Sequence, residues 1–131
     1  MTDFTGKKII SITWIAPDEN GAQALRDFYK FHKEYMLEKC FKEGPLKLVQ
    51  YTVAESPEYE EDGFVWAQGR TPNKTGRIVF HHYEVYETEE GIHHHWIDGA
   101  DIFPEISEMM TTYNLEYRMN NMLTAIHSIS S

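Results

Sequence analysis

Seven histidines occur among the 131 residues of the chain, and three of them, His93 to His95, are consecutive. Imidazole groups bind metal ions and transfer protons near neutral pH. Successive residues of a helix lie about 100° apart, so three neighbouring rings cannot all reach one ion. If Ile92 points inward, His95 and Trp96 share its face and His94 points outward. We therefore expect no metal site in this run, and we expect His95 to face the interior.

A carboxylate and a phenol accompany another histidine in residues 77–87, RIVFHHYEVYE, which alternate as a strand does. His82, Glu84 and Tyr86 then share one face and lie about 7 Å apart. A buried glutamate needs a partner, so Glu84 is either held structurally by a neighbouring ring or hydroxyl, or it accepts protons. In a dry pocket with aromatic walls, the proton affinity of such groups can be tuned for acid and base catalysis.

Aromatic residues could form the walls of a pocket for a flat ligand. The candidates are Trp14, Tyr29, Tyr51, Trp66, Tyr83 and Trp96. At strand and helix spacing, however, such residues more often fill a core. Residues 55–76 form a long irregular stretch, in which we expect Trp66 to pack at the mouth of the pocket and the acidic residues 58–62 to stay in solvent.

Common sequence motifs of nucleotide and hydrolase sites are absent: GxGxxG, GxxxxGK[ST], GxSxG and HExxH do not occur. The single cysteine, Cys40, lies in a helical pattern and is expected to be a buried apolar residue. We therefore expect neither a metal nor an organic cofactor. A metal ion, if present, would need His95 together with His32, His82 or His127.

Composition restricts the class of protein further. Acidic residues outnumber basic ones by 21 to 12, giving a net charge of -9 that would repel nucleic acid or an anionic membrane. Hydrophobic residues make up 41% of the chain, which is enough for one core over residues 1–131. No apolar run reaches the length of a membrane span, and the first residues, MTDFTGKK, lack a signal-peptide pattern. We expect a single-domain, cytoplasmic, acidic protein.

The elements that must position these side chains follow from hydrophobic periodicity. Strands are predicted at residues 8–15, 46–54, 77–87 and 122–129, and helices at 19–41 and from 88 to 113 with a break between 99 and 104. The order βαββαβ is typical of a ferredoxin-like α+β sandwich, whose helices cover one face of a four-stranded antiparallel sheet. Apolar residues on both strand faces require a second cover, so we expect a homodimer.

Residues 83–95, YEVYETEEGIHHH, resemble the strand-to-helix segment of the antibiotic biosynthesis monooxygenase-like family. Members of that family are dimeric α/β barrels of ferredoxin-like subunits. Glu84, Tyr86, Glu87 and His95 occupy the places of the family's strand glutamate, aromatic residue, acidic stretch and inward histidine. The lead into the second strand, with Gly44, Leu46 and residues 49–51, is also similar. The family's usual subunit is shorter, which makes residues 55–76 and 97–104 additions, and Gly91 stands where alanine is more frequent.

The resemblance implies a cofactor-free site, without metal or flavin, in which molecular oxygen oxidises a phenolic, quinol or enolisable substrate, or a related isomerisation occurs. His95 is then the expected catalytic acid or base, and Glu84 orients it or holds the substrate hydroxyl. The expected substrate-binding residues are His82, Tyr86, His32, Trp66, Trp14 and Trp96. The alternative is a non-enzymatic dimer that binds a small molecule or haem. A structural dimer with a filled core would have no pocket.

Overall fold

The computed structural model describes residues 3–129, and its main elements follow the predicted βαββαβ order. The elements are β1 (Lys8–Ala16), α1 (Glu19–Lys39), β2 (Leu48–Tyr59), α2 (Phe64–Ala67), β3 (Lys74–Tyr86), α3 (Glu89–Asp98), the 3-10 turn η1 (Ala100–Ile102), α4 (Phe103–Tyr113) and β4 (Glu116–Thr124). None of the helices in this part of the chain has the length and apolar content needed to cross a bilayer.

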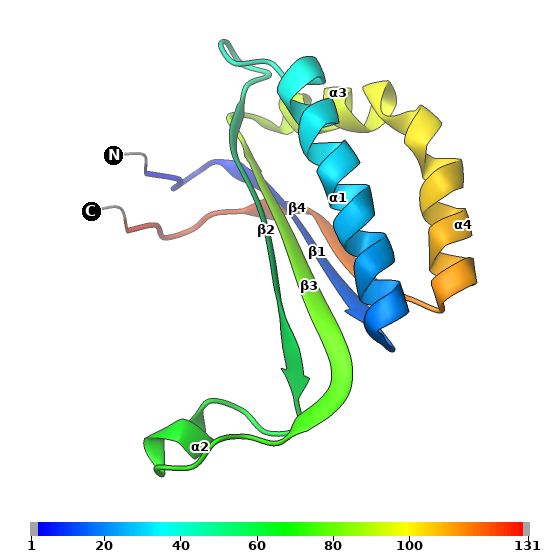
Figure 1. The fold of residues 1–131 in the computed structure, drawn as a ribbon. Coiled ribbons are helices and arrows are strands. Elements are labelled where there is room, and N and C mark those ends of the chain that lie inside the picture. Colours follow the sequence, from blue (N-terminus) through cyan, green and yellow to red (C-terminus); the bar gives the residue numbers. More distant parts are fainter. Residues whose placement is uncertain (1–2, 130–131) are drawn as a thin grey trace.

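The four strands form one antiparallel sheet in the order β2-β3-β1-β4. Helices α1, α3 and α4 all lie on one face of this sheet (Figure 1). This arrangement confirms the predicted ferredoxin-like α+β fold. We call the face under the helices the inner face and the opposite one the outer face.

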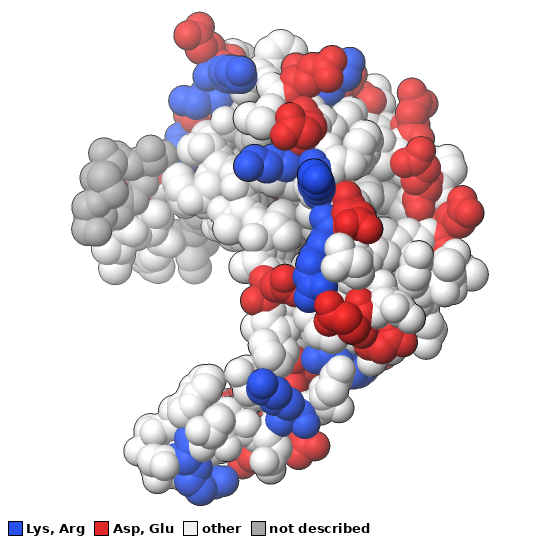
Figure 2. Space-filling model, viewed as in Figure 1, with Lys and Arg blue, Asp and Glu red and all other residues white. Residues whose placement is uncertain are grey.

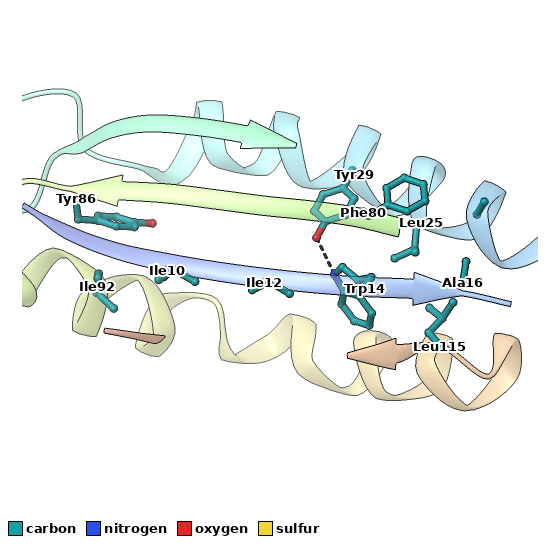
Figure 3. Packing of buried hydrophobic residues seen from close by; sticks show 11 residues of the cluster. Ile10, Ile12, Trp14, Ala16, Leu25, Tyr29, Phe80, Tyr86, Ile92 and Leu115 are labelled. Atoms are coloured by element: carbon teal, nitrogen blue, oxygen red, sulfur yellow. Dashed lines mark hydrogen bonds between the residues drawn. The ribbon is translucent and has the colours of Figure 1, made fainter. Parts of the chain in front are cut away.

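The core forms between the inner face and the helices (Figure 3). Alternate residues of β1, namely Ile10, Ile12 and Trp14, point toward the helices and are almost completely buried. Leu25 of α1 and Ile92 of α3 pack against them and are fully buried. Each such aliphatic side chain contributes about 1.5 to 3 kcal/mol through its burial.

Side-chain caps set where helices α1 and α3 begin. The Asp18 carboxylate accepts a hydrogen bond from the Gly21 amide at 2.9 Å at the start of α1. The Thr88 hydroxyl accepts one from the Gly91 amide at 3.3 Å at the start of α3. A Cβ on Gly91 would lie only 3.1 Å from a ring carbon of Tyr86. Glycine at this position therefore lets α3 approach β3 closely, which brings the histidines of α3 near the sheet.

Residues 55–76 were expected to be irregular, and this expectation is wrong for a large part of them. β2 and β3 continue past the sheet as a hairpin in which Pro57 pairs with Ile78 and Tyr59 with Lys74. We call residues 55–78, with α2 at the tip, the arm (Figure 1). Pro57 is compatible with a strand here because β2 is an edge strand that needs no donor on its free side. The Arg77 guanidinium also binds the Glu58 carboxylate across the hairpin at 2.7 Å.

The last strand was predicted at residues 122–129 but spans Glu116–Thr124, so it begins and ends earlier. Helix α4 ends at Tyr113, and the φ of 53° at its C-cap residue Asn114 lies in the left-handed region. Such a residue redirects the chain at once, so the strand follows directly after the helix. Met119 then points inward beneath the helices.

Candidate functional site

A cavity of about 240 Å³ lies between the inner face of the sheet and the helices. Most of its walls are apolar or aromatic, formed by Ile12, Trp14, Phe28, Tyr29, Trp96, Phe103, Ile106, Met110, Tyr117 and Met119. Its polar lining residues are His32, His82, Glu84, His95 and Ser107. An apolar pocket with a few convergent polar groups is the usual form of a small-molecule site, and this one suits a small ligand.

Glu84 lies at the centre of the polar lining and is 1% exposed. Its Oε2 atom lies 2.5 Å from His82 Nε2, and its Oε1 atom accepts a hydrogen bond from the Tyr86 hydroxyl at 2.7 Å. Burial opposes ionisation, but the hydrogen bonds from His82 and Tyr86, together with the neighbouring imidazole of His95, outweigh it and lower the pKa of Glu84 to about 2. The site therefore contains a buried carboxylate ion.

A chain of hydrogen bonds connects Trp14 to the Glu84 carboxylate through Tyr29 and His82. Trp14 Nε1 donates to the Tyr29 hydroxyl at 2.8 Å, and this hydroxyl lies 3.1 Å from His82 Nδ1 (Figure 3 shows the first of these bonds). Burial raises the pKa of Tyr29, so its hydroxyl keeps its proton and can donate to Nδ1. Because the ionised Glu84 carboxylate can only accept a hydrogen bond, His82 Nε2 carries a proton and donates it to Oε2.

His32 of α1 and His95 of α3 approach the same carboxylate. His95 Nε2 lies 3.6 Å from Glu84 Oε1, and the His32 and His95 rings are 6.4 Å apart between centroids. Burial lowers the pKa of His32 to about 4 and also lowers that of His95. Burial therefore favours the neutral form of both rings. His32 Nδ1 is hydrogen-bonded to the Tyr51 hydroxyl at 2.8 Å.

The three consecutive histidines point in different directions, as helical geometry predicts. His93 is exposed and lies 3.6 Å from the Glu89 carboxylate. The His94 ring packs edge-on against Phe41, and only His95 lines the cavity. His127 is exposed in the segment after β4.

Most of the residues expected to bind substrate do lie together. The cavity walls include His82, His32, Trp14 and Trp96, together with the two expected catalytic residues, His95 and Glu84. Tyr86 does not line the cavity, because its ring is 1% exposed and packs in the core; it meets the site through its hydrogen bond to Glu84 and the packing of its ring against His95.

The predicted position of Trp66 is wrong. Trp66 lies in α2 at the tip of the arm, is 54% exposed and packs edge-on against Tyr59, with 5.7 Å between ring centroids. The hairpin pairing carries this segment away from the sheet, so Trp66 does not line the cavity of its own chain. The sequence did not predict this position of Trp66, because it does not indicate how far β2 and β3 remain paired.

Tyr29 and Tyr51 have a more direct role than their sequence pattern indicated. Both were candidate wall aromatics, but their hydroxyls bind His82 and His32 respectively. The spacing of Leu25, Tyr29 and His32 along α1 places the three on one face, which was the available signal. Cys40 is half-buried, and burial raises its pKa to about 11, so its thiol is not an activated nucleophile.

Comparison with known proteins identifies the fold. No family model matches the sequence, and no curated protein matches it. Among solved structures, a Deinococcus radiodurans protein described as a "putative antibiotic biosynthesis monooxygenase" has a TM-score of 0.52 and 15% sequence identity, over 94% of this chain and 97% of that one. The chain has the fold of that protein. The resemblance noted in the sequence is thus confirmed for the fold.

Two further structures are less similar. A designed protein named Foldit4 has a TM-score of 0.38 and 12% identity, over 87% of this chain and 96% of that one. A Burkholderia cenocepacia protein described as an amidohydrolase/peptidase has a TM-score of 0.47 and 11% identity, over 91% of this chain but 28% of that one. Neither similarity is close enough to bear on function.

Proposed function

We propose that this protein is a cytoplasmic enzyme that oxidises or isomerises a small phenolic, quinol or enolisable compound without an organic cofactor. The observation that carries the proposal is the cavity itself, which is apolar along its walls and ends at a buried carboxylate surrounded by imidazoles. Such a site holds a flat apolar molecule and accepts the proton of its hydroxyl or enolisable C–H group. The fold shared with the Deinococcus protein adds support for monooxygenase-like chemistry.

His95 is the member of the cluster best placed to receive the substrate proton. Its side chain is 10% exposed, compared with 1% for the side chain of Glu84, and it makes no hydrogen bond within the described residues. Glu84 is already held by His82 and Tyr86, so its negative charge would stabilise a protonated His95 and fix the ring's orientation. Proton removal would give an electron-rich oxyanion for reaction with O2.

The oxidation needs no further reductant. When a phenol becomes a quinone, one oxygen atom of O2 forms the new carbonyl group. The other oxygen atom leaves as water, with the hydroxyl hydrogen and one ring hydrogen. Isomerisation would use the same proton acceptor, which would return the proton at another atom of the substrate.

A test of this proposal combines turnover with blocking of the cavity. Met109 and Met110 are adjacent, half-buried residues of α4, but only Met110 lines the cavity. We expect a panel of quinols and enolisable carbonyl compounds to contain a substrate whose turnover falls at least about tenfold in Met110→Trp, because the indole fills the substrate's space. Met109→Trp is the matched control and should retain most activity. Equal activity of the two variants, or no turnover of any compound, would contradict the proposal.

A non-enzymatic binding protein is the second candidate. The observation in its favour is that both Glu84 oxygens already have hydrogen-bond partners, which a purely structural buried carboxylate also requires. This candidate predicts that a compound binds, that Met110→Trp weakens its binding, and that no product forms.

We further propose that the enzyme is a homodimer joined through the outer sheet faces. No helix of the described chain covers the outer face, which carries Thr13, Val79, His81 and Tyr83 on its central strands (Figure 1). Figure 2 shows that this side is hollowed between the arm and the body of the molecule. Sedimentation at micromolar concentration should therefore give twice the mass of one chain. A folded monomer would contradict this expectation.

A further inference from the structure

His32, Glu84 and His95 come from three different elements, α1, β3 and α3, and meet at the polar end of the cavity. One potential ligand atom from each residue lies within 4.8 Å of those of the other two. Two imidazoles and one carboxylate are the ligand set of many zinc and non-haem iron sites. We propose that these three residues bind one divalent transition-metal cation, a departure from the metal-free protein expected from the sequence.

The distances suit a shared ion better than direct contact. His95 Nε2 and Glu84 Oε1 are 3.6 Å apart, which is too long for a good hydrogen bond. Two ligands of a tetrahedral ion, with bonds of about 2.0 to 2.1 Å, stand about 3.3 Å apart. Each of the three side chains would therefore need to move inward by less than about 1 Å to close around an ion.

Charge also favours a cation at this position. A buried carboxylate ion is costly unless positive charge or strong hydrogen bonds compensate it. Glu84 is 1% exposed, and its carboxylate lies beside the imidazoles of His32 and His95, which offer ring nitrogens and no acidic oxygen. A divalent cation at this position would add positive charge next to the buried carboxylate.

Neighbouring side chains form hydrogen bonds to the proposed ligands His32 and Glu84. In known metal sites, such outer partners, which bind the ligands and not the ion, orient the ligands in the same way. The Tyr51 hydroxyl binds His32 Nδ1, which leaves Nε2 of that ring without a hydrogen-bond partner in the described chain. His82 and Tyr86 each bind one Glu84 oxygen and so fix the carboxylate plane. Partners of this kind orient metal ligands and increase their basicity.

Three protein ligands leave at least one coordination position open, and here it would face the cavity. The imidazole and carboxylate set suits zinc or ferrous iron better than magnesium or calcium, which prefer oxygen ligands alone. A cation at this position could polarise a substrate oxygen as a Lewis acid, which deepens the proposed function: in the metal-bound form the cation, and not the coordinated His95, would activate the substrate. Metal binding can be tested without any substrate, so its failure would leave the proposed turnover untouched.

The test uses full-length protein without a histidine tag, stripped with a chelator and titrated with Co2+, followed by its visible absorption, and with Zn2+, followed by calorimetry. We expect one ion per chain. His32→Ala and His95→Ala should each weaken binding by at least about 100-fold, since each removes a ligand and not only an outer partner. Tyr51→Phe should weaken binding by about tenfold, because it removes only the hydrogen bond to His32.

The matched control is the double variant His93→Ala/His94→Ala, which removes two neighbouring histidines that do not line the cavity. This variant should bind Co2+ as tightly as the unchanged protein. Near-ultraviolet circular dichroism of each variant separates loss of a ligand from loss of the fold, and Tyr51→Phe supplies a test if an alanine variant does not fold. The proposal is overturned if the metal-stripped protein binds less than one ion per chain. It is also overturned if the affinity for Co2+ depends on His93 and His94 and not on His32 and His95.

Discussion

Replacing His95 by alanine should lower turnover of a responsive quinol or enolisable substrate by about 100-fold or more, the usual scale for losing a general acid or base. The structure gives the reason, because His95 lines the cavity with its Nε2 atom 3.6 Å from the Glu84 carboxylate. The ring makes no hydrogen bond within the described residues, so its removal should change stability much less than activity. Steady-state kinetics of the metal-stripped protein measures the proton-transfer role apart from any bound cation.

The control is His93→Ala, two positions earlier on the same helix, where the side chain is exposed. Its turnover should match that of the unchanged protein. Glu84→Gln should also lower the rate, because it removes the negative charge and keeps the shape of the side chain, while dimerisation should persist. If His95→Ala instead unfolds the chain, His95 is a core residue and the catalytic assignment fails. If a ligand still binds and its affinity depends on His95, but no compound turns over, the binding-protein candidate is correct.

Replacing His82 by alanine should give the largest loss of stability among the site variants, about 3 kcal/mol or more in the free energy of unfolding. His82 Nε2 is the 2.5 Å partner of Glu84 Oε2, and both side chains are almost fully buried. Truncation leaves that carboxylate oxygen without its hydrogen-bond partner, and losing one member of a buried pair is strongly destabilising. Urea unfolding monitored by tryptophan fluorescence gives the value.

A double-mutant cycle separates this effect from simple loss of packing. In His82→Ala/Glu84→Gln the buried negative charge is absent, so the double variant should lose less stability than the sum of the two single changes. His93→Ala should change the free energy of unfolding by less than about 0.5 kcal/mol, as expected for an exposed position. Additive single losses would show that the His82 and Glu84 side chains are not coupled.

Local periodicity in the sequence was sufficient to predict the fold and the direction of several site residues. Strand alternation placed His82, Glu84 and Tyr86 on one face, and the structure has all three on the inner side of β3. Helical spacing predicted that His95 points inward and His94 outward, and in the structure His95 lines the cavity while His94 packs against Phe41 outside it. These features depend only on the geometry of the element that carries them, and each element's geometry follows from a short stretch of sequence.

The length of the arm and the position of Trp66 could not be predicted from local sequence patterns alone. Strand pairing continues through residues 55–59 and 74–78 because each strand supplies the other's hydrogen-bond partners and Arg77 binds Glu58 across the hairpin. Neither strand has a strong alternation there, so the sequence alone predicted an irregular stretch. Trp66 lies in the short helix α2 at the tip of the hairpin. The hairpin strands, and not the residues of α2 itself, set the direction of this helix.

Only the tertiary structure decided that His32, Glu84 and His95 meet. They are separated by 52 and 11 positions along the chain, and no spacing rule connects a residue of α1 with one of β3. Their meeting requires α1 and α3 to lie on the same sheet face, with Gly91 permitting the close approach of α3 to β3. The sequence by itself determined which side chains each element turns inward. The packing of the helices on the sheet determined which of them share one space, because contacts between distant segments depend on the whole fold.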